Sequence, residues 1–468
     1  MMASSGRTRN RRRGAPTQPS GAAGSSGCLD AFMIALNQAS DGKRCWYTST
    51  KELQLASLEF CAACRSVPTL LVNVEEATPT RLWMGAPARE TRSAKGLSST
   101  HVPVIQARVV AWKLSASALR RMGNPLSRVR VFCFDDEFNG DMRGVTWPRE
   151  LERLEFGDDF KHPITEVAWP VSLQVLYFES SSGQRLAGVS LPPSLRELSF
   201  AYAPDLDLAG VTWPVSLKEL YVLAGFNQSI DAMVWPPSLE ILNLGDDFMQ
   251  PIDGVRWPGS LQQLTFGNAF NQPFTGVQWP SSLQQLTFRS NFEHLVDGTR
   301  WPPSLQTLEL RHSFNQPVDQ ASWPQSLRQL TFGVEFNQPI EGVKWPASLQ
   351  QISFDYSFNQ PLDRVEWPAS LQQLDLGYEF NQAITEVKWS PSLVKVTFGE
   401  SFNQSLVGVA WPASLRELAF SSYFSLPSES FEWPASLKKL MIPCRPNEPL
   451  PSWPGVRVVG IWSDFWGS

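Results

Sequence analysis

The sequence has little of several features that define common protein classes. It has six cysteines among 468 residues, and none of them recurs at a fixed spacing. Its 40 basic and 45 acidic side chains leave a formal net charge of only −5, and it contains no run of 18 apolar residues. We therefore expect no disulfide scaffold, no nucleic-acid partner and no membrane-spanning helix.

Patterns that carry chemistry are also missing. The four histidines share no spacing with a nucleophile or an acid, so no hydrolase triad can be assembled from the sequence, and no glycine-rich phosphate loop occurs. Cys61 and Cys64 form a CxxC, but no histidine lies close and only Cys28 and Cys45 are near. We favour two packed cysteines over a zinc site. The sequence predicts a protein that is not an enzyme, with no catalytic residue, cofactor or metal.

What the sequence does contain is one unit of 22 residues, WPxSLxxLxFGxxFNQPIxGVx, in fourteen consecutive registers without an insertion. Each unit opens on a Trp-Pro step, from Trp147 to Trp433, except that Leu191-Pro192 and Trp389-Ser390 fill two of the slots. The leucine four residues further on never changes. Because the register is kept, each unit must meet its neighbour in the same geometry.

Each unit is predicted to be a short strand with a turn-rich return. In LxxLxF the apolar and polar residues alternate, so Leu264 and Phe266 should point inward while Gln263 and Thr265 point outward. Two prolines in a unit leave no room for a long helix. A single unit cannot bury its apolar face, so we predict a mainly β repeat solenoid whose strands stack about 4.8 Å apart.

Residues 336–340, with the sequence FNQPI, and residues 270–273, with FNQP, resemble the core of the FNIP repeat, a variety of the leucine-rich repeat. The preceding PxSLxxLxF is similar to the short, helix-free leucine-rich repeats of bacterial effectors. The resemblance covers about residues 125–442. It implies a curved, leucine-rich-repeat-like arc of 22-residue units with a parallel sheet on its concave face, and it implies no particular reaction.

Two polar columns and one aromatic column recur in the return segments. We interpret the asparagines and glutamines as a structural ladder, because side-chain amides can satisfy backbone groups in turns and in the adjacent unit. The tryptophans are interpreted as packing. The ladder columns are Asn227, Asn271, Asn315, Asn337, Asn359, Asn381 and Asn403, with Gln228, Gln272, Gln316, Gln338, Gln360, Gln382 and Gln404.

The segments that flank the array have a different composition. Residues 1–27 are predicted to be a disordered tail with a basic cluster at residues 7–13, for which a solvated tail, a nuclear address and an organellar transit peptide remain alternatives. The first residues lack the apolar h-region of a secretory signal peptide. We therefore expect an intracellular protein, cytoplasmic or nuclear. Residues 443–468 are predicted to cap the C-terminal end.

Residues 28–124 lack the 22-residue period. Their patterns predict helices over 29–39, 50–65 and 115–122 and strands over 70–74 and 107–112. We interpret them as a small α/β cap, because the end of a solenoid exposes an apolar cross-section. An alternative is an F-box-like region, since residues 55–65 resemble the closing helix of that motif, although its Leu-Pro opening is absent. The protein would then be a substrate-recognition adapter of a ubiquitin ligase.

The outward positions of the strands are what a partner can contact. Most are polar and uniform, but the N-terminal units carry aromatic and apolar side chains there, which indicates a contact patch. We predict a non-enzymatic, monomeric scaffold that binds a protein partner through its concave sheet. Unselected variation of the surface and an ice-binding or surface-binding solenoid with a threonine column are the alternatives. The candidate contact residues are Tyr177, Glu197, Tyr221, Ile241 and Asn243.

Overall fold

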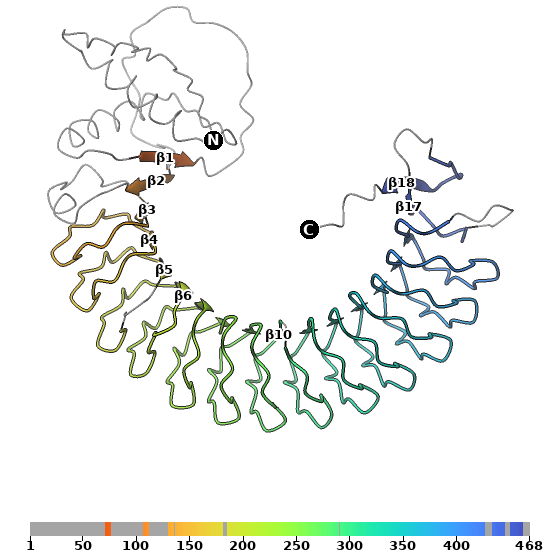
Figure 1. Cartoon of the computed structure of the whole chain (residues 1–468), viewed down its shortest axis with the longest axis horizontal. Coiled ribbons are helices and arrows are strands. Elements are labelled where there is room, and N and C mark those ends of the chain that lie inside the picture. The colour runs from red at the N-terminus through yellow and green to blue at the C-terminus, as the bar shows by residue number, and fades with distance from the viewer. Residues whose placement is uncertain are drawn as a thin grey trace, which may run out of the picture.

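The computed structural model describes residues 71–75, 106–111, 130–134, 136–180, 185–289, 291–425, 433–444 and 450–461. Within these segments the chain forms 18 strands and no helix, so no helix there could cross a membrane. Figure 1 shows an arc with the strands along its inner rim and the return segments along its outer rim. The N-terminal tail, the expected helices, and Cys61 and Cys64 lie outside the described residues.

The strands follow the predicted register, and the solenoid prediction is confirmed. From β2 onward each strand pairs in parallel with the next, 22 residues on through the array, as in Leu264↔Leu286↔Leu308. The strands are β1 (Leu71–Glu75), β2 (Gln106–Ala111), β3 (Val131–Phe134), β4 (Arg153–Phe156), β5 (Val175–Ser180), β6 (Glu197–Tyr202), β7 (Glu219–Ala224), β8 (Ile241–Asn243), β9 (Gln263–Phe266), β10 (Gln285–Phe288), β11 (Thr307–Leu310), β12 (Gln329–Phe332), β13 (Gln351–Ser353), β14 (Gln373–Asp375), β15 (Lys395–Thr397), β16 (Glu417–Ala419), β17 (Lys439–Pro443) and β18 (Arg457–Ile461).

Both ends of the sheet carry a strand outside the regular register. The two strands expected before the array correspond to β1 and β2, which pair antiparallel, and β2 then pairs in parallel with β3 through Arg108↔Val131. At the other end β18 pairs with β17 through Leu440↔Val458, 18 residues apart instead of 22. Each end strand therefore satisfies backbone groups that the terminal units would otherwise present.

Aromatic stacking explains the direction of curvature. Hydrogen bonds hold neighbouring strands about 4.8 Å apart, and the strand phenylalanines stack close to that spacing, with 5.2 Å between the ring centroids of Phe156 and Phe178. Rings in the return segments are further apart, at 6.1 Å for Phe336 and Phe358 and 6.4 Å for Trp323 and Trp345. Because the returns are spaced more widely than the strands, the array bends with the sheet inside. The packing role predicted for the tryptophans is confirmed.

The predicted asparagine ladder is also confirmed. The Oδ1 atom of Asn337 accepts hydrogen bonds from the backbone N–H of Asn359 and from Nε2 of Gln360, both at 2.9 Å, and the next unit repeats the pattern. A second ladder runs through the serines, where Ser348 Oγ donates to the carbonyl of Leu327 at 2.6 Å. These side chains replace the strand hydrogen bonds that the return segments lack.

Replacing Asn337 with alanine should lower the free energy of unfolding by about 1–3 kcal/mol, because the Asn359 N–H loses its acceptor and the Gln360 amide keeps only the backbone carbonyl of residue 337. Denaturant unfolding followed by circular dichroism measures the loss. The control is Glu341→Ala, which removes only an exposed ion pair with Arg364 at 3.5 Å and should cost less than about 1 kcal/mol. Equal losses in the two variants would contradict a ladder that stabilises the returns.

Candidate binding face

The concave face presents three columns of side chains, one more than the sequence predicts. The alternation that turns two residues of each strand outward continues past the buried phenylalanine, as in β5, where Val175, Tyr177 and Glu179 all face outward. The third slot holds glycine in several units, and at Gly267 a Cβ would overlap the backbone of the preceding unit. Side chains project from this column only where another residue replaces the glycine. The small residues Ala201 and Ser421 replace it in two units, and the longer side chains in this column are Glu179, Leu223, Arg289, Arg311 and Asp355.

The five predicted contact residues lie on four adjacent strands. Tyr177 is in β5, Glu197 in β6, Tyr221 in β7, and Ile241 and Asn243 are in β8. The register pairs Tyr177 with Ser199, Ser199 with Tyr221 and Tyr221 with Asn243, so these positions form one row across the sheet. The structure therefore brings the candidates together, and their role in binding stays a prediction.

Hydrogen bonds tie the two tyrosines to carboxylates on the same strands. Tyr177 Oη donates to Glu179 Oε2 at 2.5 Å, and Tyr221 Oη donates to Glu219 Oε2 at 2.8 Å. Partial burial first, and these carboxylates second, raise the pKa of both tyrosines well above the usual range. Both phenols therefore stay neutral donors at physiological pH and hold the carboxylates in place.

Two further carboxylates complete an acidic and aromatic surface, which we call the acidic patch: Glu155, Tyr177, Glu179, Glu197, Glu219 and Tyr221 on β4–β7 and their ends. Glu197 accepts a hydrogen bond from Ser199 Oγ at 3.1 Å. Glu155 pairs with Arg153 at 2.5 Å, so that arginine offsets one of the four charges. The sequence signal for the patch was the i, i+2 spacing of tyrosine and glutamate, because such residues share one face of a strand.

Asn243 has a structural role that the sequence reasoning did not foresee. Its side chain is 7% exposed, and its Oδ1 accepts a hydrogen bond from the backbone N–H of Gly245 at 2.9 Å. Gly245 has φ 74°, which an L residue adopts only with strain. Asn243 therefore stabilises the turn that ends β8 and offers little surface to a partner, so we leave it out of the proposed contact set.

Asp375 occupies the same slot as Asn243, six units later in the array, and accepts a hydrogen bond from Gly377 N–H at 3.3 Å. Burial raises its pKa, although the Gly377 bond opposes the shift. A carboxyl with a raised folded-state pKa favours folding below its unfolded pKa, and this contribution is lost as the pH rises through the folded value.

We therefore expect Asp375→Asn to raise the melting temperature near pH 7, since the amide keeps the acceptor and removes the buried charge. The gain should shrink as the pH falls toward about 4. Melting curves of both proteins at several pH values test this, with exposed Asp363→Asn as the control. A gain independent of pH would contradict the burial of the charge as its cause.

Metal chemistry gains no support from the described part of the chain, where no group of three or more histidine, cysteine, aspartate or glutamate side chains is placed to hold an ion. A further exposed feature is a pair of stacked rings, Tyr356 and Tyr378. Their centroids are 4.5 Å apart and their planes differ by 8°. The two rings are 41% and 38% exposed, so they form a small aromatic platform near the ends of β13 and β14.

Comparisons with known proteins agree with this architecture. The model of the FNIP repeat family matches residues 226–269, 248–291, 300–335 and 336–379. Among solved structures, CroV588, whose structure is described as a novel circular LRR protein, is 36% identical over 67% of this chain and 49% of its own, with a TM-score of 0.57. The chain thus spans about half the length of that structure.

Two further structures are more distant. An internalin, InlF from Listeria monocytogenes, is 13% identical over 62% of this chain and 86% of its own, with a TM-score of 0.40. A chain of the Toll–Spatzle complex from Drosophila is 11% identical over 72% of this chain and 57% of its own, with a TM-score of 0.46. No curated protein sequence matches the chain.

Proposed function

Because the chain carries FNIP repeats and is a solenoid of the leucine-rich-repeat type, we propose that it is a non-enzymatic, monomeric scaffold that binds a protein partner through its concave sheet. Repeat solenoids present extended concave surfaces of this kind for binding. The observation that carries the proposal is the acidic patch, which places two tyrosines and four carboxylates on one open sheet face.

The chemistry of the acidic patch favours a partner segment rich in lysine or arginine. Tyrosine rings offer large contact area at a low cost in conformational entropy, and here their hydroxyls are already fixed by Glu179 and Glu219. A cationic side chain above such a ring gains a cation–π interaction and meets a carboxylate within the same patch. The excess of negative charge also attracts a basic segment before contact.

Neither alternative function gains a supporting observation. The region expected to resemble an F-box lies largely outside the described residues. A surface-binding solenoid needs a flat and regular threonine array, whereas this sheet curves (Figure 1) and Glu309, Ser353 and Asp375 interrupt the column.

The proposal predicts that charge removal on the concave face weakens partner binding. The test is a triple variant, Glu179→Gln with Glu197→Gln and Glu219→Gln. In affinity purification with quantitative mass spectrometry, this variant should retain at least about 10-fold less partner than the wild-type chain does. The same variant should bind a fluorescent arginine-rich peptide correspondingly more weakly than the wild-type chain does. Both losses should grow smaller as salt is added.

The matched control is a second triple variant with the same change in net charge, Glu341→Gln with Glu366→Gln and Glu386→Gln, all exposed residues of the return segments. It should retain both the partner and the peptide at wild-type levels. Equal retention by the two triple variants would refute the acidic patch as the binding surface, and equal loss would point to net charge alone.

A further inference from the structure

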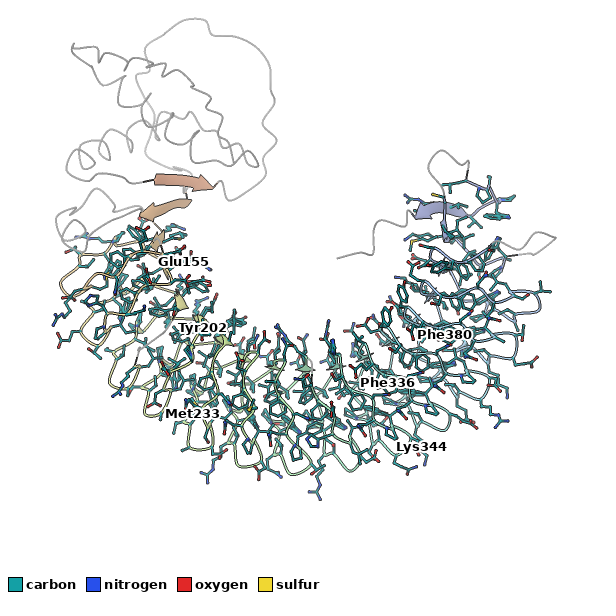
Figure 2. All side chains as sticks on the ribbon, viewed as in Figure 1. Glu155, Tyr202, Met233, Phe336, Lys344 and Phe380 are labelled. Carbon is teal, nitrogen blue, oxygen red and sulfur yellow. The ribbon has the colours of Figure 1, made fainter. Side chains whose placement is uncertain are left out.

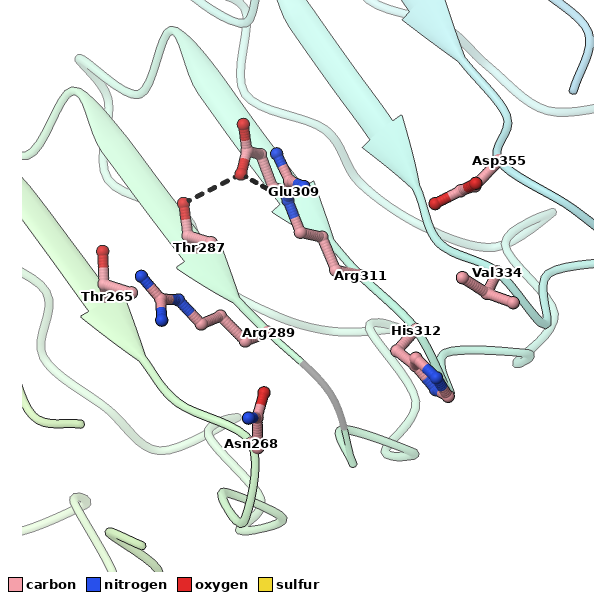
Figure 3. A pocket seen from close by; sticks show the side chains of 9 residues that line it. All are labelled: Thr265, Asn268, Thr287, Arg289, Glu309, Arg311, His312, Val334 and Asp355. Atoms are coloured by element: carbon pink, nitrogen blue, oxygen red, sulfur yellow. Dashed lines mark hydrogen bonds and ion pairs between the residues drawn. The ribbon is translucent and has the colours of Figure 1, made fainter. Parts of the chain in front are cut away.

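A depression of about 560 Å³ opens on the concave face where β9 to β12 end, apart from the acidic patch, and its lining includes two arginines, Arg289 and Arg311, and two carboxylates, Glu309 and Asp355. Figure 3 shows the side chains that line it, with Thr265, Thr287, Arg289 and Arg311 reaching over the strands and His312 at the edge. The surrounding array is otherwise the neutral part of the sheet, so two adjacent arginines here are a local departure from the repeat.

The third outward column explains why the depression exists. Arg289 N–H donates to the carbonyl of Phe266 at 3.1 Å, and Arg311 N–H donates to that of Phe288 at 2.9 Å, so the strand pairing extends by one residue in both units. Both arginines thereby keep the outward alternation. The same slot holds Gly267 on one side and Gly333 on the other. Two long side chains are thus flanked by positions without any, which leaves a hollow around them.

Internal contacts orient one guanidinium and leave the other with unused donors. Arg311 Nε donates to Glu309 Oε2 at 2.9 Å, and Thr287 Oγ1 donates to the same oxygen at 3.3 Å. These contacts fix Arg311 but do not involve its terminal Nη donors. Arg289 Nη1 lies 3.8 Å from Asp246 Oδ1, too far for a hydrogen bond. Within the described part of the chain, the Arg289 guanidinium has no hydrogen-bond acceptor.

We propose that the Arg289–Arg311 depression binds a phosphate monoester. Two guanidinium groups on adjacent strands can share an anion that has three terminal oxygens, with the Thr265 hydroxyl at the same site. A carboxylate has only two oxygens, and a single arginine can satisfy both of them. The arginines remain charged at physiological pH, so the donor set is permanently available.

The neighbouring surface favours a phosphorylated segment of a protein over free phosphate. Val334, which lines the depression, shares its slot with Tyr356 and Tyr378 in the next two units. The stacked rings of these tyrosines are exposed. Tyr356 lies one strand spacing beyond Val334 along the sheet, and Tyr378 lies two strand spacings beyond it, or about 10 Å. A phosphorylated segment bound through its phosphate can place a following side chain on this aromatic platform. Inorganic phosphate has no such side chain and can contact only the depression.

Isothermal titration calorimetry of the full chain near pH 7.5, where a phosphate monoester is a dianion, tests the proposal. The probes are a short phosphoserine peptide with a tyrosine two residues after the phosphoserine, the same peptide without phosphate, and inorganic phosphate. We expect the phosphopeptide to bind at least about 10-fold more tightly than either of the others. Absence of binding by the phosphopeptide would overturn the site. Equal affinity for inorganic phosphate would overturn its assignment to a protein segment.

The variants are Arg289→Gln, which breaks no hydrogen bond within the described segments, and Arg289→Gln with Arg311→Gln. Each should weaken phosphopeptide binding by at least about 10-fold with an unchanged melting temperature for the single variant. The control, Arg364→Gln, removes an arginine of the return segments that is 73% exposed, and it should bind as the wild type does. Wild-type affinity in the double variant would refute the assignment. The triple glutamine variant of the acidic patch should still bind the phosphopeptide, so the two proposals fail separately.

Discussion

Replacing Phe336 with alanine should lower the free energy of unfolding by about 3–5 kcal/mol. The ring is fully buried and touches four others: its centroid is 4.1 Å from that of Phe332 and 6.0–6.1 Å from those of Phe314, Phe354 and Phe358. Hydrogen bonds of the sheet and of the asparagine ladder fix the spacing of the units on both sides of the ring. The cavity left by the substitution therefore cannot collapse, which places the cost at the high end for a phenylalanine. Figure 2 shows Phe336 among the packed units of the arc.

The position of the unit within the array supplies the control. Phe424 fills the same slot near the C-terminal end and stacks on Phe420 and Phe402, at 4.0 and 6.2 Å. It is 5% exposed, so Phe424→Ala should cost less than Phe336→Ala. Urea unfolding followed by circular dichroism compares the two. In a solenoid each unit contacts only its neighbours, so the central variant should also broaden or split the transition. Equal losses and equally sharp transitions would contradict a cost set by the rigidity of the neighbouring units.

The 22-residue period predicted most of the fold because the period itself is a structural constraint. A fixed step with an unchanging leucine requires equivalent neighbours, and the alternation in LxxLxF assigns one face of each strand to the core. The structure bears this out in the buried leucines and phenylalanines, and in the ladder that passes through Asn337. The buried strand faces and the asparagine ladder depend only on residue type and spacing, and both can be read directly from the sequence.

The third column of the concave face was missed for a physical reason. A glycine after the strand was interpreted as its end, so the residues that replace the glycine were not counted among outward positions. Arg289 extends the strand pairing because its backbone N–H donates to the carbonyl of Phe266 in the previous unit. This contact depends on both units, so it cannot be predicted from the sequence of one unit. Asn243 shows the reverse case, since its slot faces outward but its amide is occupied by the turn at Gly245.

Replacing Gly267 with alanine should cost about 1–3 kcal/mol or more, because a Cβ there would overlap the carbonyl of Gly245 and the Cα of Asp246. These are backbone atoms of the preceding unit, which the ladders hold in place, so they cannot move as a flexible side chain would. Gly267 has no positive φ, and the cost is therefore steric overlap and not backbone strain. Gly259→Ala is the matched control, because a Cβ at Gly259 meets nothing within 4 Å.

The outcome also tests how the third column is built. The backbone at residue 267 could instead adopt the extended conformation found at Arg289. In that case Gly267→Ala lowers the free energy of unfolding by less, and the alanine faces the concave surface beside Arg289. The depression then narrows on that side, and phosphopeptide affinity falls while the fold is kept. Thermal unfolding of Gly267→Ala and Gly259→Ala separates these cases. Equal melting temperatures together with unchanged phosphopeptide affinity would show that glycine is not required in this slot, and the hollow around the two arginines would then need a cause other than the flanking glycines.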